Sequence, residues 1–359
     1  MTSNDSTEDR ASRPTAREMF EAVTEVVVPR WPMPLKGATN PGQAEAERLH
    51  TAWLKKYDLA GRSCRPETMR LSIVTSYAYP NADVEVLALA ADLTAWLFVV
   101  DELFDTGETG LSVASARAVI SSLDAPPTAP SPACSIPKAH SLLLQRIRDA
   151  YDDLASRLRD RMTPPHWRVF TDHLGAYYGA LAAEAANREQ GIVPDLEDYL
   201  AIRRFSAGTQ CQLDLVELAQ STRLPRHLYE SQPFHELVHA TCDVANWAND
   251  VFSAAKEYEA GDVHNLVLIL QGQANCSLPE AAVLAVDHIE KRLREMQDAQ
   301  IRLTASLVRH GASPAALEAG QRWADGLRCF LNHGAWYLDL ARYSTAEHTT
   351  PGGSPPFPA

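Results

Sequence analysis

The sequence predicts an all-helical protein. Three observations favour this fold class: apolar residues recur at intervals of three and four, Pro- and Gly-bearing connectors separate these stretches, and no segment alternates long enough to demand a sheet. The sequence therefore divides into helices joined by loops. The predicted helices cover residues 15–24, 42–57, 83–105, 139–161, 165–188, 196–220, 233–259, 263–272, 279–309 and 314–343.

Individual stretches support this division in chain order. After the first helix, EVVVP at residues 25–29 is the one place where the chain could extend locally. The stretch 83–105 is hydrophobic nearly all round, which is typical of a helix in the middle of a bundle. Residues 234–259 contain neither Gly nor Pro, so we expect one continuous helix that ends near Gly261. Connectors such as GQANCSLPE and RHGASP separate the last helices.

The domain organisation is predicted to be simple. The Pro-rich connector at 124–138 is the best candidate boundary, but neither flank has enough helices to bury a separate core. We therefore expect one domain over residues 15–343, with a disordered N-terminal segment at 1–14 and a disordered tail at 344–359.

Composition and charge exclude several classes of protein. The chain of 359 residues has 33 basic and 46 acidic residues, a net charge of −13, and no Lys- or Arg-rich run, so we expect no nucleic-acid partner. The N-terminus lacks the apolar core of a signal peptide, and the longest hydrophobic run contains Asp92, so we expect a cytoplasmic protein without stable membrane insertion. Its six cysteines show no C-x-x-C spacing, which argues against a disulfide scaffold or a zinc ribbon.

The helix predicted at 233–259 carries a zinc-like pattern. His235, Glu236 and His239 form His-Glu-x-x-His, which is typical of zinc peptidases that draw a third ligand from further along the chain. Glu259 is the nearest candidate in spacing, but on a continuous helix it lies about 30 Å from His239. A zinc metallopeptidase is therefore a disfavoured alternative, and ordinary core or cavity-wall histidines are favoured.

The same helix carries a second, oxygen-bearing pattern. Asn249, Ser253 and Glu257 are four residues apart and fall within a wedge of about 80°, with Lys256 about 20° from Asn249 on the helical wheel. Taken alone, such a line of polar residues is more often a solvated helix face. A second acidic cluster elsewhere makes a metal site the better interpretation.

That cluster is VVDELFDTGETG, where Asp101, Glu102 and Asp105 end an otherwise apolar helix. Carboxylates at the end of a central helix are expected at the mouth of an interior space, and burying them without cations is unfavourable. The alternative is a helix end that simply reaches solvent. Hard oxygen ligands from two helices, without Cys, suit Mg²⁺ together with a diphosphate.

These motifs resemble those of the class I terpene synthases, especially the single-domain bacterial type. DELFD at 101–105 is similar to the aspartate-rich motif, with Glu102 in place of its second Asp, and NDVFSAAKE at 249–257 matches the second metal motif in full. Arg342 and Tyr343 match the C-terminal Arg-Tyr pair. Arg203 lies 46 residues before Asn249, which favours it over Arg204 as the diphosphate sensor.

The resemblance implies an α-helical bundle around a deep apolar cavity, with three Mg²⁺ ions, or Mn²⁺ as a substitute, and an isoprenyl diphosphate substrate. It implies a lyase that ionises this substrate, most often farnesyl diphosphate, and cyclises the carbocation to a terpene hydrocarbon or alcohol. Geranyl and geranylgeranyl diphosphate are alternative substrates. The implied metal ligands are Asp101, Glu102, Asp105, Asn249, Ser253 and Glu257, and the implied diphosphate donors are Arg203, Lys256, Arg342 and Tyr343.

The substrate's hydrocarbon chain would contact a further set of residues. Phe98 and Trp336 match family positions in the cavity wall, where an aromatic face stabilises a cation, and Ser206 and Ala207 match positions at a helix break. Asn246 lies on the same inward face of helix 233–259 as Asn249, and His239 and His235 continue this face toward the N-terminus of the helix.

The rival interpretations of the function are a chain-elongating prenyltransferase and a non-catalytic helical binding protein. We expect the protein to be a monomer or a homodimer.

Overall fold

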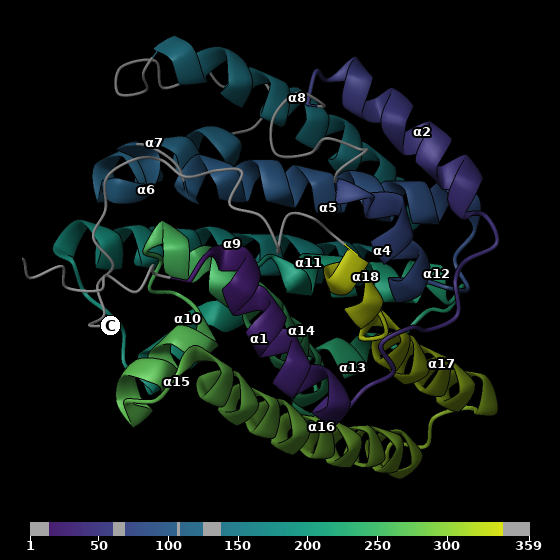
Figure 1. The fold of residues 1–359 in the computed structure, drawn as a ribbon. Coiled ribbons are helices and arrows are strands. Elements are labelled where there is room, and N and C mark those ends of the chain that lie inside the picture. Colours follow the sequence, from purple (N-terminus) through teal and green to yellow (C-terminus); the bar gives the residue numbers. More distant parts are fainter. Residues whose placement is uncertain (1–13, 60–68, 106–107, 125–137, 340–359) are drawn as a thin grey trace, which may run out of the picture.

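A computed structural model describes residues 14–59, 69–105, 108–124 and 138–339, and all regular structure in these ranges is helical. The predicted all-α fold is therefore confirmed (Figure 1). The first half contains α1 (Ala16–Val27), the 3₁₀ helix η1 (Val28–Arg30), α2 (Gln43–Lys56), α4 (Leu71–Ala78), α5 (Val84–Asp105), α6 (Glu108–Leu111), α7 (Val113–Asp124), α8 (Lys138–Arg161) and α9 (Pro164–Gln190). The second half contains α10 (Leu196–Ser206), α11 (Thr209–Leu213), α12 (Leu215–Ala219), α13 (Arg226–Tyr229), α14 (Gln232–Ala260), α15 (Leu266–Ala274), α16 (Leu278–Arg309), α17 (Pro314–Phe330) and α18 (Gly334–Asp339).

Helix α5 runs through the bundle, as its apolar sequence predicts. Every residue from 86 to 97 is buried, and α2, α4, α8 and α9 pack around the helix (Figure 1). Three of its acidic residues, Asp101, Glu102 and Asp105, lie together at its C-terminal end, so α5 ends in charge after passing through the core. The helices before the connector at 125–137 pack directly against those after it, since α5 and α7 both contact α8 and α9.

Helix α14 is the second element that positions the site. It lies along α16 and also contacts α1, α10, α11 and α15 (Figure 1). As predicted, it is continuous and ends at Gly261, whose φ of 73° is the left-handed conformation that closes many helices. The N-terminus of α1 is bound to this end of α14, since Glu259 accepts a hydrogen bond from the Ala16 amide.

The predicted continuous helix at 196–220 is wrong, because the chain breaks between α10 and α11. Gly208 has a φ of 64°, and a Cβ at this position would lie 2.6 Å from a methyl group of Leu97 on α5. Both the backbone conformation and the close approach to α5 therefore require glycine here. The break lies directly after Ser206 and Ala207, the two positions where the family resemblance implies one.

The predicted helix at 314–343 is also interrupted. Helix α17 ends at Phe330 and α18 begins at Gly334. The N-terminal connector binds the chain at the break, since the Ala335 amide donates to Leu35 and the Gly37 amide donates to Asn332. These contacts between distant segments replace hydrogen bonds that a continuous helix would make within itself.

Four α-helices of the described ranges were not predicted, namely α4, α6, α7 and α13, and the local extension considered at 25–29 does not occur. Helix α4 buries Ser72, Thr75 and Ser76 beside its apolar residues, so its inner face lacks a hydrophobic pattern. Helix α7 buries only Ala116, Val119, Ser122 and Leu123 among its described side chains. Residues 25–30 are helical, with α1 passing into η1. The segments expected to be disordered lie outside the described residues except for residue 14, and none of the described helices is long and apolar enough to cross a membrane.

Candidate active site

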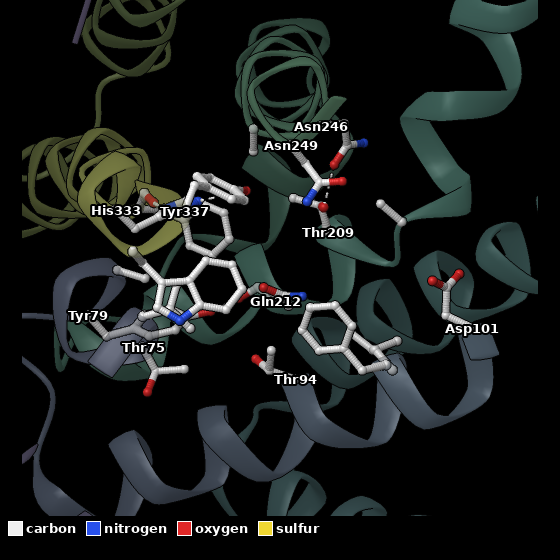
Figure 2. A pocket seen from close by; sticks show the side chains of 18 of the residues that line it. Thr75, Tyr79, Thr94, Asp101, Thr209, Gln212, Asn246, Asn249, His333 and Tyr337 are labelled. Atoms are coloured by element: carbon white, nitrogen blue, oxygen red, sulfur yellow. Dashed lines mark hydrogen bonds between the residues drawn. The ribbon is translucent and has the colours of Figure 1, made fainter. Parts of the chain in front are cut away.

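A cavity of about 120 Å³ opens between α4, α5, α14 and the break between α17 and α18. This volume is many times the roughly 10–15 Å³ that one water molecule requires, so the cavity can admit an organic ligand. Figure 2 shows polar side chains on several sides of it, with Asp101 on α5 on one side and His333 and Tyr337 on the other. The cavity is therefore chemically different at its two ends.

The wall on the side of His333 and Tyr337 is largely aromatic. Phe330, Trp336 and Tyr337 line it, and Phe98 adds an aromatic ring from α5. The Trp336 indole is fixed by a hydrogen bond of 3.0 Å to the Met69 carbonyl, while the Tyr337 ring stacks on Phe252 at 4.9 Å. The two predicted wall residues, Phe98 and Trp336, are thus brought to the same cavity from α5 and α18.

The two acidic motifs both reach this cavity. Asp101 at the end of α5 and Asn249 on α14 line the same cavity, although they are 148 residues apart in the sequence (Figure 2). Glu102 is partly exposed and is not among the lining residues. Asp105 lies in the last turn of α5, and its side chain is outside the described part of the structure.

The oxygen-bearing line on α14 continues from Asn249 into the protein. Ser253 is buried, with 1% of its surface exposed, and Glu257 is partly buried. The side-chain amide of Asn265 donates to Glu257 Oε2 at 2.8 Å and lies 3.4 Å from Ser253 Oγ. Asn265 thereby holds two of the predicted ligands in place and leaves oxygen lone pairs available.

This donor set fits a hard divalent cation. The ligand atoms are an amide oxygen, a hydroxyl and a carboxylate, with a further carboxylate on α5. Burial raises the pKa of the Glu257 carboxyl, with Lys256 acting in the opposite direction. A cation beside Glu257 would offset the cost of this buried negative charge. Lys256 is partly buried, and it contributes a positive field next to the predicted ligands.

Arg203 lines the cavity next to Asn249. Its guanidinium donates to Asp250 Oδ1 through Nε and Nη2, at 3.0 and 2.7 Å, and Nη2 also lies 3.1 Å from Asn249 Oδ1. Burial alone would lower the pKa of Arg203, but the Asp250 carboxylate raises it well above its ordinary value. Arg203 is therefore a permanent cation at the edge of the cavity.

Asp250 anchors this arrangement from within the core. It is fully buried and accepts hydrogen bonds from the Tyr199 hydroxyl and, at 3.0 Å, from the Leu266 amide at the start of α15. Three helices, α10, α14 and α15, are thus joined at one carboxylate. A buried charge satisfied on every side is costly to disturb, so the position of Arg203 is well fixed.

Arg204 points to a different set of partners. Its guanidinium makes a two-fold contact of 2.8 Å with the Asp243 carboxylate, which Arg292 on α16 also binds. Arg204 does not line the cavity, whereas Arg203 does. The geometry therefore favours Arg203 among the two arginines that the sequence left open.

The helix break after α10 also reaches the cavity. Ala207 lines it directly, while Ser206 is buried nearby. Asn246 lines it as predicted, but its polar atoms are engaged: its amide donates to the Arg203 carbonyl at 2.9 Å, and its oxygen accepts from Thr209 at 2.6 Å. Asn246 therefore joins both sides of the break to α14.

The zinc-like pattern forms no comparable site. His235 is exposed, and Glu236 is paired at 2.9 Å with Arg302. Within the described ranges, no group of three or more His, Cys, Asp or Glu side chains could hold a metal ion. Neither His235 nor His239 is among the residues that line the cavity.

Some relevant residues were missed, and two predicted ones are not described. Arg342 and Tyr343 lie outside the described residues. Sequence reasoning did not find Asn265, Asp250 or Tyr199, because their roles arise only where separate helices meet. For Asp250 a signal was present, since it stands beside Asn249 within the metal motif.

Comparisons with known proteins agree with this geometry. A family model described as terpene synthase family 2, C-terminal metal binding, matches residues 92–295, which include both acidic motifs. The (+)-T-muurolol synthase of Roseiflexus castenholzii, named as cyclising farnesyl diphosphate, is 35% identical over 71% of this chain and 76% of its own. Pristinol synthase of Streptomyces pristinaespiralis is 34% identical over 87% of this chain and 83% of its own.

A solved structure shows the same architecture. Germacradien-4-ol synthase from Streptomyces citricolor superimposes with a TM-score of 0.70 at 26% identity, covering 85% of this chain and 96% of that one. The family model spans more than half of this chain, and both named relatives exceed 30% identity over more than two thirds of it. The chain therefore belongs to the class I terpene synthases, which are lyases that act on diphosphate substrates.

Proposed function

We propose that this enzyme uses Mg²⁺ to ionise farnesyl diphosphate and cyclises the resulting carbocation to a sesquiterpene hydrocarbon or alcohol. The observation that carries the proposal is that Asp101 and Asn249, from two distant motifs, line the same cavity as the aromatic side chains of α18. The named activity of the muurolol synthase relative supports the choice of a farnesyl substrate.

The polar end would hold the diphosphate. Magnesium bound by Asp101, Asn249, Ser253 and Glu257 would supply positive charge that stabilises the departing diphosphate. Arg203 contributes a fixed cation from the protein itself, held toward the cavity by Asp250. Because these groups are arranged before the substrate arrives, little reorganisation is needed as charge develops on the leaving group.

One contact would have to change on binding. Arg203 Nη2 donates to Asn249 Oδ1, the same amide oxygen that is proposed to bind the cation. Release of this contact would free one N–H for a diphosphate oxygen, while Arg203 Nε remains on Asp250. Binding of a cation by Asn249 Oδ1 would thus change the orientation of Arg203, because both interactions use the same oxygen atom.

The aromatic end would hold the hydrocarbon. The faces of Phe98 and Trp336 can stabilise a carbocation through their quadrupoles without reacting with it. The surrounding apolar wall excludes water that would otherwise quench the cation before cyclisation is complete. This division separates the leaving group from the reactive cation.

The test is an assay with purified protein and Mg²⁺. Geranyl, farnesyl and geranylgeranyl diphosphate are supplied separately, diphosphate release is measured, and volatile products are identified by gas chromatography with mass spectrometry. We expect cyclic products from farnesyl diphosphate, and loss of turnover when the metal is chelated. Cyclic products from only one of the other two substrates would overturn the farnesyl assignment, and turnover in chelator would overturn the metal's role.

A further inference from the structure

The aromatic end of the cavity contains a titratable side chain that the proposed function does not use. His333 lies between α17 and α18, is only 8% exposed and lines the cavity. Figure 2 shows it next to Tyr337, across the cavity from Asp101. An imidazole in an otherwise aromatic wall is costly to bury, so its role needs an explanation.

Hydrogen bonding determines which ring nitrogen of His333 carries the proton. Nδ1 lies 2.5 Å from the carbonyl oxygen of Phe330, and because a carbonyl can only accept, Nδ1 must be the donor. In the neutral imidazole, Nε2 is then left with its lone pair. Nε2 lies 3.4 Å from the hydroxyl of Tyr337, which can donate to it.

The Tyr337 hydroxyl is thus the first donor in a chain of hydrogen bonds. The chain runs from the Tyr337 hydroxyl to His333 Nε2, and from His333 Nδ1 to the Phe330 carbonyl. Stacking of the Tyr337 ring on Phe252, at 4.9 Å and 12° between planes, fixes the orientation of the phenol. The geometry is that of a side chain able to accept a proton as it passes its own to a base.

We propose that Tyr337 and His333 together accept the proton whose loss ends the carbocation cascade, an inference that rests on the proposed function. A C–H bond next to the cationic carbon breaks, its electron pair becomes the new C=C bond, and the proton goes to the Tyr337 oxygen. The original Tyr337 hydroxyl proton moves to His333 Nε2. The products are a neutral alkene, a neutral phenol and an imidazolium, which returns its proton to solvent after product release.

The properties of His333 suit this role. Burial lowers its pKa to about 4, so the imidazole is neutral and ready to accept a proton near pH 7. A weak base is sufficient, because a carbocation is a far stronger acid than any protein side chain. The Phe330 carbonyl at 2.5 Å also stabilises the imidazolium that forms.

Other ionisable residues of the cavity wall fit the role less well. The Tyr79 hydroxyl donates to the backbone carbonyl of Gln212 at 2.7 Å, and a carbonyl cannot take the proton that Tyr79 would have to pass on. Asp101 lies at the diphosphate end, where it is proposed to bind a cation. Tyr337 is therefore the wall tyrosine that has a base behind it.

The test compares product composition with diphosphate release for Tyr337→Phe, using farnesyl diphosphate and Mg²⁺. We expect the ratio of the main product to all others to fall at least about tenfold, while diphosphate release falls much less, because ionisation occurs at the other end of the cavity. Tyr178→Phe makes the same change in a buried tyrosine that does not line the cavity, and should keep the native ratio. An unchanged ratio in Tyr337→Phe would overturn the proposal.

A rescue experiment separates proton transfer from packing. In His333→Ala, added imidazole should restore the native product ratio, whereas pyrrole, a ring of the same size without a basic nitrogen, should not. Equal rescue by both rings would show that His333 only fills space and would overturn its role. If wild-type protein releases diphosphate from none of the three substrates, the proposed function itself fails, which is a different result from a native ratio in Tyr337→Phe.

Discussion

Helix α14 carries two metal-like patterns, and its two halves have very different surroundings. In the half that begins at Asn249, Asp250 is fully buried and bound by Tyr199, Arg203 and the start of α15. In the other half, His235 is exposed, and the ion pair of Glu236 with Arg302 has side chains that are 32% and 51% exposed.

The difference teaches that a metal pattern becomes a site only when other elements complete it. The downstream half lines a cavity at Asn249 and contacts α10 and α15, whereas His235 is exposed and Glu236 is paired near the surface. Exposed ion pairs contribute little, while buried and fully bonded charges hold their neighbours in position. Substitutions in the two halves should therefore have very unequal effects.

The largest effect is expected at the cavity-facing end of α14. Asn249→Ala removes a proposed ligand oxygen and the partner of Arg203, so we expect diphosphate release to fall by roughly 10²–10³-fold or more, the range seen when a preorganised polar group is lost. The measurement is steady-state release with farnesyl diphosphate and Mg²⁺. Asn81→Ala, an identical change at an exposed position, is the matched control. A fully active Asn249→Ala enzyme would contradict the proposed ligand set.

The second effect distinguishes two adjacent arginines. Arg203→Lys keeps the charge but loses the fork that spans Asp250 and the cavity, so we expect kcat/KM to fall roughly ten- to hundredfold, the equivalent of one charge-assisted hydrogen bond. Arg204→Lys should have little effect on kcat/KM, because Arg204 points away from the cavity and Arg292 still binds Asp243. A larger loss in the Arg204 variant would reverse the assignment.

Much of the fold could be predicted because long helices leave a strong periodic signal. The nearly uniform apolar sequence of α5 and the absence of Gly and Pro from residues 234–259 were sufficient to predict both central helices. The breaks were not predictable from periodicity. Gly208 is required by the approach of Leu97, and the α17–α18 break is bound by Leu35, contacts that join distant parts of the chain.

The candidate site shows the same division between local and distant information. The spacing of Asn249, Ser253 and Glu257 is local, and it was readable from the sequence. The residues that hold this set have no such pattern: Asn265 comes from the start of another helix, and Tyr199 from a third. His333 was also missed, because a lone histidine in a sequence gives no sign that it faces a cavity.

The third effect compares a buried histidine with exposed ones. Burial lowers the pKa of His333 to about 4, below its ordinary value of 6.5. Between pH 4 and pH 6.5 the unfolded chain binds a proton at His333 that the folded protein does not bind. The contribution of neutral His333 to the free energy of unfolding is therefore complete above about pH 6.5 and is lost as the pH falls toward 4. Linkage gives a loss of about 2 kcal/mol between pH 7 and pH 5 from this group.

Urea unfolding at the two pH values measures this loss. Wild-type protein should lose about 2 kcal/mol more than His333→Gln, which cannot titrate. His227→Gln makes the same substitution at an exposed histidine and is the matched control for the change of side chain. Equal losses in wild type and His333→Gln would mean that the folded protein protonates His333 as readily as the unfolded chain.

The smallest effect is expected in the upstream half of α14. His235→Ala should leave diphosphate release within about twofold and change the free energy of unfolding by no more than about 0.5 kcal/mol, because the side chain is exposed. A zinc peptidase would instead lose its activity with this histidine and would contain stoichiometric zinc. Metal analysis of the purified protein, together with the His235→Ala assay, therefore decides between the two halves. Both patterns lie on the same helix. A fully active His235→Ala variant together with an inactive Asn249→Ala variant would therefore show that the contacts around each half determine which pattern serves the reaction.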